Sequence, residues 1–376
     1  MKIAVVRETA PGETRVAASP ETVKKFIGLG AEVAVESGAG QSASIADADF
    51  EAAGATVSPR EKLLGDADII LCVSGPDAGS LKGAKSGALL VGALDPLRRG
   101  DAIQGYAAAG FEALAMEWMP RITRAQSMDI LSSQSNLAGY KAVIDGAAVY
   151  GRAFPMMMTA AGTISAARVF VMGVGVAWLQ AIATARRLGA QVSATDVRSA
   201  TKEQIQSLGA KPIFVENVAG IEGEGKGGYA TEMSEEYQKA QAELVSGHIA
   251  KQDIVVTTAL IPGRPAPRLI SDAQLASMRP GSVVVDLATD AGGNVEGCVP
   301  GENVVKHGVT IIGATNLARS LAADSSALFA RNLFNFLSAF WDKEQGKLVL
   351  PDDDEIVKAI RLTQNGKVVS ERLAST

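Results

Sequence analysis

Apolar runs of strand length alternate with helical patterns along almost all of this 376-residue chain. In the first part, residues 3–6, 32–36 and 67–73 have the strand pattern, and a helical pattern at 21–29 stops at Gly30. Such alternation is typical of α/β layers, in which helices cover a sheet. Because the length exceeds that of one ordinary domain, we expect two.

The alternation continues into a second unit. A helix expected over 128–150 is followed by strand patterns at 167–172, 191–195, 211–215, 253–257, 282–287 and 309–312. This order predicts a doubly wound sheet. An apolar helix at 325–340 is expected to return to the first unit. The predicted fold is α/β, with two Rossmann-like domains built on parallel sheets: a discontinuous N-terminal domain, 1–130 and 320–376, and a second domain, 131–319.

Composition excludes several classes of protein. The net charge is −5 and no long basic block occurs, so nucleic acid is not expected as a partner. Cys72 and Cys298 are too few for a disulfide framework and favour a reducing compartment. The first eight residues lack a signal-peptide pattern, and no run of about 18 apolar residues predicts a membrane span. The chain is therefore expected to be cytoplasmic.

A dinucleotide fingerprint lies within residues 169–198. Gly173 and Gly175 follow a predicted strand and precede a predicted helix, and Asp196 ends the next strand. In such a turn the glycines allow the backbone to approach a pyrophosphate at the helix N-terminus. The carboxylate accepts hydrogen bonds from the ribose hydroxyls and favours NAD over NADP. This segment of the chain therefore predicts an NAD(H) site, in the cleft between the two domains.

The third fingerprint position is Trp178 instead of glycine. In the usual fold this residue faces the strand closely, where an indole has no room. We therefore expect either a helix displaced outward or an indole turned toward the nucleotide, and both would weaken binding. Arg198 is a second departure, since a guanidinium can pair with a 2′-phosphate.

Polar side chains are dense at 121–136, ahead of the second sheet. Arginine with aspartate or glutamine supplies the donor and acceptor that a carboxamide such as nicotinamide needs. The alternative is a helix start with Asp129 in its first turn. The run at 155–163 is expected to be packing and turn, and the glycine-rich stretch at 217–233 an exposed loop.

Motifs for other chemistries are missing from the sequence. It contains no HExxH, CxxC or GxSxG, so metal hydrolysis and serine acyl transfer have little support, and no metal site is expected. His248 and His307 are both expected at the surface. Reduction of a carbonyl usually needs a proton donor, whereas hydride transfer between two nicotinamides needs none. The missing acid–base pair therefore suits the second reaction.

Residues 121–140, RITRAQSMDILSSQSNLAGY, resemble the signature loop and helix of proton-translocating nicotinamide nucleotide transhydrogenase. The match is to the soluble NAD(H)-binding component of its alpha subunit. Segments 11–17, 154–163, 194–198 and 257–263 are also similar to this family, so that the resemblance covers nearly the whole chain.

The resemblance implies a role for each matched residue. Arg121, Gln126 and Asp129 would form the catalytic group around the nicotinamide, with Gln126 bringing the ring toward NADP(H). Tyr229 would belong to a mobile loop that closes over bound nucleotide. The NAD(H) contacts expected from the fingerprint and the resemblance together are Ser127, Met128, Ser132, Gly173, Gly175, Val176, Asp196, Val197, Arg198, Gly228, Tyr229, Gln241 and Leu260.

The resemblance also implies partners. Hydride would pass from NADH on this chain to NADP⁺ on a beta subunit, driven by proton flow through that subunit and a membrane alpha chain. The chain itself would form a homodimer and lie at the cytoplasmic face of the inner membrane through these subunits. Asp290 and Ala318 depart from the family, which has glutamate and proline there, and Trp178 departs from its glycine.

Two other functions are weighed against this one. Alanine dehydrogenase has a related two-domain fold, and Arg15 matches its substrate arginine. However, Ser74 and the stretch 92–95 stand where that family has a lysine and a histidine. The other alternative is a non-catalytic NAD-sensing or scaffold subunit whose fingerprint has decayed at Trp178.

Overall fold

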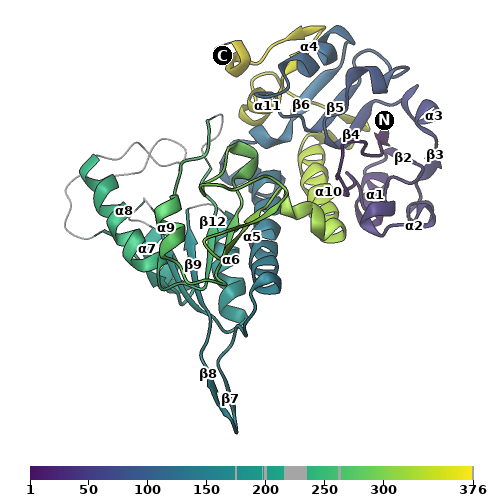
Figure 1. Cartoon of the computed structure of the whole chain (residues 1–376). Coiled ribbons are helices and arrows are strands. Elements are labelled where there is room, and N and C mark those ends of the chain that lie inside the picture. The colour runs from purple at the N-terminus through teal and green to yellow at the C-terminus, as the bar shows by residue number, and fades with distance from the viewer. Residues whose placement is uncertain (174–175, 197, 199–200, 216–234, 261–263, 375–376) are drawn as a thin grey trace. The chain divides into compact units, whose positions relative to one another are not determined.

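The chain forms two compact units (Figure 1). The first holds residues 1–134 and 319–376, and the second holds residues 135–318. The computed structural model describes residues 1–173, 176–196, 198, 201–215, 235–260 and 264–374. Each unit has its own sheet and its own hydrophobic core on both faces of that sheet.

The first unit is built on a six-stranded parallel sheet. Its order is β3 (Thr56–Ser58), β2 (Glu32–Glu36), β1 (Lys2–Val5), β4 (Ile69–Ser74), β5 (Leu89–Ala93) and β6 (Glu112–Ala115). The chain order therefore reverses between β1 and β4. In open α/β sheets, ligands bind outside the carboxyl ends of the strands at such a switch point.

Helices cover both faces of this sheet. One core combines side chains of α1 (Pro20–Gly28), α2 (Asp47–Ala52), α10 (Ala322–Ala339) and α11 (Glu355–Ile360). The other combines α3 (Arg60–Leu64) and α4 (Gly100–Ala108). Phe329, Leu333 and Phe336 of α10 are buried in the first core, which ties the late helix to the early strands. Smaller elements complete the unit: hairpins β16 (Trp341–Asp342) with β17 (Lys347–Leu348) and β18 (Thr363–Gln364) with β19 (Lys367–Val368), and α12 (Glu371–Ala374).

The second unit has the same strand order with one strand added. The sheet runs β11 (Lys211–Pro212), β10 (Gln191–Thr195), β9 (Arg168–Met172), β12 (Ile254–Thr257), β13 (Val283–Asp286), β15 (Val309–Gly313) and β14 (Asn303–Lys306). Its switch point lies between β9 and β12. The edge strand β14 is antiparallel to β15, and the others are parallel.

Five helices line the two cores of the second unit. α5 (Ile130–Val149), which begins in the first unit, shares a core with α6 (Val176–Arg187) and α7 (Thr201–Ser207). α8 (Glu235–Ile249) and α9 (Asp272–Ser277) contribute to the core on the other face. A two-stranded hairpin, β7 (Met157–Thr159) with β8 (Gly162–Ile164), projects from this unit (Figure 1).

The predicted fold class, a two-domain α/β protein with mostly parallel sheets, is confirmed. Two local predictions are wrong at least in part. The run at 155–163 contains the expected turn, but its apolar residues are exposed on a hairpin instead of packed. The antiparallel strand β14 was not predicted. His248 is half-buried, because its Nε2 lies 2.7 Å from the Ser193 hydroxyl and its ring stacks edge-on against Phe170.

Within the described ranges, no helix is long and apolar enough to cross a membrane. Cys72 and Cys298 are both free thiols.

Candidate functional site

The loop ahead of α5 carries the polar residues predicted in the first unit. Residues Thr123–Met128 form a 3₁₀ helix, η4, and Arg121 lies just before it. Gln126 and Ser127 are exposed, whereas Met128 is buried in the core of the first unit. Ala125 is also buried in that core, so the turn is anchored by two apolar residues and presents polar side chains outward.

Two side-chain amides of α10 anchor this turn. The side chains of Asn332 and Asn335 each donate a hydrogen bond to the Ser127 carbonyl oxygen, both with N–O distances of 2.9 Å. Asn332 also accepts a hydrogen bond from the Ser133 hydroxyl at 2.7 Å. The backbone next to Gln126 is thus tied to a helix about 200 residues away in the chain. Sequence reasoning missed both asparagines, because two amides on a helix resemble ordinary solvent-facing residues.

Asp129 and Ser132 contact each other at the start of α5. Oδ1 of Asp129 accepts a hydrogen bond from the Ser132 backbone at 3.0 Å, and Oδ2 accepts one from the Ser132 hydroxyl at 2.5 Å. This is the arrangement of a helix N-cap. The helix-start role considered for Asp129 is therefore present, and its role at a nicotinamide stays a prediction.

The fingerprint turn of the second unit requires glycine at its first position. Gly173 follows β9 with a φ of +101°, a conformation that side chains rarely adopt. A Cβ there would lie 2.8 Å from the Ala259 nitrogen, at the end of β12. The turn and the β12 loop are therefore in backbone contact at the switch point. α6 begins at Val176, the next predicted contact, while Gly175 lies outside the described residues.

Trp178 is fully buried in the core between the sheet, α5 and α6. Of the two arrangements expected for this indole, the one turned toward the nucleotide is excluded by this burial, and the effect of Trp178 on NADH affinity stays a prediction. Alanines in the same core, such as Ala142, Ala181 and Ala194, leave volume that the ring can occupy. Close helix approach occurs instead at Gly139 of α5, where a Cβ would lie 1.9 Å from the Ala177 carbonyl oxygen.

Asp196 lies at the end of β10 with only 3% of its surface exposed. One carboxylate oxygen accepts the Arg198 backbone N–H at 2.7 Å, and Nε of Arg198 lies 3.4 Å from the same oxygen. The guanidinium is thus directed toward the chain's own carboxylate. Such a buried carboxylate can accept the ribose hydroxyls of NAD and disfavours a 2′-phosphate.

The remaining predicted contacts are spread over the second unit. Gln241 is half-buried on α8, and Leu260, which follows β12, is 51% exposed. Val197, Gly228 and Tyr229 lie outside the described residues.

The polar groups at the end of β12 fit a bound dinucleotide. The hydroxyls of Thr257 and Thr258 are buried and have no hydrogen-bond partner within the stretches of chain that the structure describes. Leaving such a group unpaired costs roughly 1–3 kcal/mol, so these hydroxyls point to a polar ligand at this edge. Beside these hydroxyls, the Gly173 turn lies so close to the Ala259 backbone that a side chain at position 173 would collide with it. No cluster of metal-ligating side chains occurs among the described residues.

The switch point of the first unit is occupied by its own side chains. Glu8 follows β1, and its carboxylate accepts the backbone N–H groups of Val73 and Ser74 at the end of β4, at 2.6 and 3.1 Å. Beside it, Glu13 forms two 2.7 Å hydrogen bonds with the Arg15 guanidinium. Burial raises the pKa of Glu8 to about 7. The crevice that could receive a ligand in this sheet is therefore closed by an acid and an ion pair.

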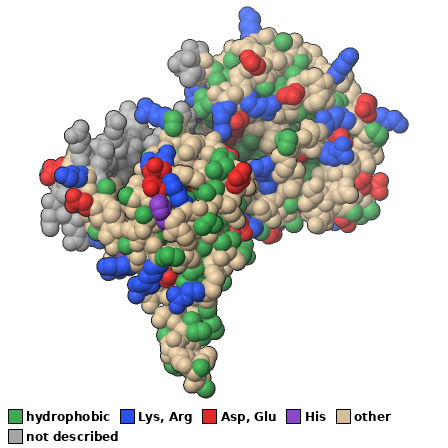
Figure 2. All heavy atoms as spheres, in the orientation of Figure 1, with side chains coloured by type: hydrophobic (Ala, Val, Ile, Leu, Met, Phe, Trp, Pro, Cys, Tyr) green, Lys and Arg blue, Asp and Glu red, His purple; other side chains and the backbone are tan. Residues whose placement is uncertain are grey.

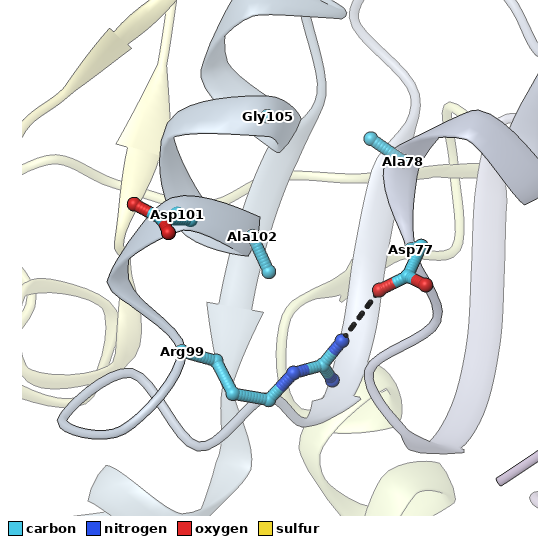
Figure 3. A pocket seen from close by; sticks show the side chains of 6 residues that line it. All are labelled: Asp77, Ala78, Arg99, Asp101, Ala102 and Gly105. Carbon is cyan, nitrogen blue, oxygen red and sulfur yellow. Dashed lines mark hydrogen bonds and ion pairs between the residues drawn. The ribbon is translucent and has the colours of Figure 1, made fainter.

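A separate pocket of the first unit contains none of the predicted site residues. Figure 3 shows Arg99 reaching across it to Asp77, with 2.9 Å between the paired atoms. Arg99 is already paired with Asp77, and the remaining lining residues are Asp101, two alanines and a glycine, so we assign this pocket no function.

A buried acid makes the first unit sensitive to pH. Burial raises the pKa of Glu117 from 4.5 to about 7, and backbone hydrogen bonds, among them one from the Asp95 N–H, offset this only in part. A raised folded-state pKa contributes stability that is complete below pH 4.5 and is lost as the pH rises through 7. In the wild type the free energy of unfolding should fall between pH 5 and 8. We expect Glu117→Gln to make this fall smaller by about 2 kcal/mol.

Thermal unfolding across this pH range measures that difference. The control is Glu344→Gln, which changes an exposed carboxyl group of the same unit and should leave the pH profile as in the wild type. Parallel profiles for Glu117→Gln and the wild type would mean that Glu117 is not protonated in the folded state.

The fold and the fingerprint turn define a class: a two-domain α/β protein of the dehydrogenase type. Residues 4–138 match the alanine dehydrogenase/PNT N-terminal domain, and residues 142–371 match the alanine dehydrogenase/PNT C-terminal domain. The chain therefore belongs to the alanine dehydrogenase/PNT family, and within it to the transhydrogenase alpha subunits, as its individual relatives show.

The chain is 55% identical to a protein from Rhodospirillum rubrum that is named as the first part of NAD(P) transhydrogenase subunit alpha, with 99% of each chain covered. It is 47% identical to the protein of the same name from Rickettsia prowazekii, covering 98% of this chain and 96% of that one. The crystal structure of transhydrogenase from Sinorhizobium meliloti matches with a TM-score of 0.90 and 53% identity, covering 98% and 100%. These matches confirm the resemblance to transhydrogenase.

Alanine dehydrogenases are more distant. The enzyme from Halomonas elongata is 30% identical over 100% of this chain and 96% of its own. A solved L-alanine dehydrogenase shares the fold, with a TM-score of 0.82 at 23% identity, and covers 100% of this chain and 98% of its own.

Proposed function

We propose that this chain is the NAD(H)-binding subunit of a proton-translocating transhydrogenase. When bound, NADH supplies a hydride that NADP⁺ on a partner subunit accepts, giving NAD⁺ and NADPH. The observation that carries the proposal is the η4 turn, which exposes Gln126 while two asparagine amides hold the carbonyl oxygen of its neighbour Ser127, in a chain 55% identical to a transhydrogenase alpha subunit.

The chain's own residues would bind and orient the dinucleotide. Asp196 would accept the adenosine ribose hydroxyls, and the Gly173 turn would receive the pyrophosphate at the positive end of α6. Arg121, Gln126 and Asp129 would hold the nicotinamide. None of these steps needs a general acid, because a hydride moves from ring to ring.

The partners follow from the reaction. A beta subunit would carry NADP(H), and it would form the proton pathway together with a membrane alpha chain. This chain would then lie at the cytoplasmic face of the inner membrane through those subunits. The name of the Rhodospirillum rubrum relative, which designates it as one portion of subunit alpha, supports such a division of the alpha subunit.

We also propose a homodimer in which the projecting hairpin contacts a second copy. Residues 155–165 are all exposed and carry no charge, and Figure 2 shows hydrophobic side chains along this projection at the foot of the view. Exposed apolar patches of this kind usually mark interaction sites. The exposed apolar residues of the hairpin and of α5 in this unit are Tyr140, Val149, Met156, Met157, Met158 and Ile164.

The structure gives little support to alanine dehydrogenase activity. Arg15, the match to that family's substrate arginine, is held by two hydrogen bonds to Glu13 and a third, of 2.9 Å, to Gln134. It is 7% exposed. A keto acid would have to displace a bidentate carboxylate that is already in place. The sensor alternative assumed a fingerprint damaged at Trp178, and the burial of that indole in the core argues against it.

The test is hydride transfer by the Gln126→Asn variant. The chain is mixed with membranes that hold the partner subunits, and reduction of an NADP⁺ analogue by NADH is followed together with NADH binding by fluorescence. We expect the transfer rate to fall by about 10- to 100-fold while the NADH Kd changes less than about threefold, because shortening the side chain misaligns the rings.

Gln206→Asn, the same change at an exposed position of α7, is the control and should alter neither quantity. Equal losses of transfer and binding in Gln126→Asn would remove the proposed role of Gln126. Tight NADH binding without transfer in the wild type would favour the sensor, and NADH oxidation that depends on pyruvate and ammonia would favour alanine dehydrogenase.

A further inference from the structure

One buried amide connects the ends of β12 and β13 in the second unit. The side chain of Asn294 is fully buried. Its Oδ1 accepts the Ala259 N–H at 3.0 Å, and its Nδ2 donates to the Ala259 carbonyl at 2.9 Å and to the Pro267 carbonyl at 2.8 Å. Both backbone groups of one loop residue are therefore held by a single side chain.

Asn294 is itself held by the last residue of β13. The fully buried carboxylate of Asp286 accepts the backbone N–H groups of Asn294 at 2.7 Å and Val295 at 3.0 Å through Oδ2. Its Oδ1 accepts the Ala288 N–H at 2.9 Å. Because three backbone N–H groups converge on the two oxygens of one buried side chain, this arrangement fixes the Asn294 backbone relative to the sheet.

The residue that Asn294 holds lies at the predicted dinucleotide turn. Ala259 stands between Thr258, whose hydroxyl has no partner in the described ranges of the chain, and Leu260, a predicted NAD(H) contact. Its nitrogen is also the atom nearest to where a Cβ of Gly173 would be. A shift of Ala259 would therefore change both the loop after β12 and the space at the glycine turn.

We propose that Asn294 is a positioning residue for the nicotinamide half of NAD(H), acting through residues 258–260. The inference rests on the NAD(H) site proposed above. In a doubly wound sheet the two halves of the dinucleotide lie on opposite sides of the switch point. Asp196 on β10 marks the adenosine side, so the loop after β12 faces the other half.

The test compares two ligands on the Asn294→Ala variant of the full chain. NADH binding is measured by fluorescence and 5′-AMP binding by equilibrium dialysis. We expect the NADH Kd to rise about tenfold or more, since Ala259 loses both of its hydrogen bonds to Asn294. The AMP Kd should stay within about twofold of the wild type, because the adenosine side is held by β10.

Gln274→Ala is the matched control. Gln274 is also a buried amide of the second unit, but it caps α9 by accepting the Ser271 N–H at 2.8 Å. It should lower the melting temperature without changing the ratio of the two Kd values. A merely structural role for Asn294 would give the same result as this control.

The outcomes separate the two proposals. Wild-type protein that does not bind NADH would reject the NAD(H) site itself and this inference with it. If the wild type binds NADH but Asn294→Ala leaves the ratio of the NADH and AMP Kd values unchanged, only the role of Asn294 is overturned. This includes the case in which both Kd values rise equally. If Asn294→Ala does not fold, Asn294→Leu carries the same test, because it fills nearly the same volume and removes both hydrogen bonds to Ala259 without adding a charge.

Discussion

Trp178→Gly is expected to destabilise the second unit strongly and not to tighten NADH binding. The indole is fully buried among α5, α6 and the sheet, so its removal leaves a large cavity. Replacing a buried tryptophan by a small residue costs about 3–5 kcal/mol, and glycine inside a helix adds about 1 kcal/mol. Urea unfolding measures the loss, and NADH fluorescence reports binding by the remaining folded protein.

Trp178→Phe is the matched control for this variant. It keeps a ring in the core and removes the indole N–H, which is buried without a partner in the described residues. Relief of that unpaired donor offsets some of the lost volume, and we expect a change within about 1 kcal/mol. Wild-type stability together with tighter NADH binding in Trp178→Gly would show that the indole crowds the nucleotide after all.

Replacement of Met157 and Ile164 by aspartate together is expected to convert a dimer into a monomer. The two residues are paired across the hairpin, so both side chains lie on one face of it. Two carboxylates placed at an apolar contact would either be buried without water or force the two copies apart. Burial of unpaired charge costs more free energy than separation, so we expect the copies to separate. Sedimentation velocity of wild type and variant at equal concentration measures the change.

Val305→Asp is the control for the hairpin variant. Val305 is an apolar residue of the second unit that is 68% exposed on the edge strand β14, away from the hairpin in the sequence. Its replacement should leave the oligomeric state unchanged. A wild-type chain that sediments as a monomer, or a hairpin variant that remains a dimer, would contradict the proposed contact.

The order of the elements could be predicted from the sequence because each strand of a buried parallel sheet is a continuous apolar run. Residues such as Val283, Val284 and Val285 leave little choice of structure. The hairpin at 157–164 was missed because its residues also form a continuous apolar run. Nothing in the local sequence shows whether such a strand is buried in the core of its own chain or exposed on the surface.

The proposed site could be predicted from the sequence where its residues belong to local structures. Gly173 with Asp196, and the polar loop from Arg121 to Ser132, could be found because the glycine turn and the helix start are local structures. Asn294, Asn332 and Asn335 could not be found in this way. Their partners lie 27 to 208 residues away, and an amide shows what it holds only when the chain brings that partner near.

The sequence by itself determined the two α/β units, the dinucleotide turn and the family, since these depend on residue type and spacing along the chain. Only the tertiary structure decided the position of Trp178. Volume in a core is a sum over residues from many segments, and here alanines distant in sequence make room for the indole. The same holds for the closed crevice of the first unit, where Glu8 and Glu13 are brought to the ends of β1 and β4 by the fold.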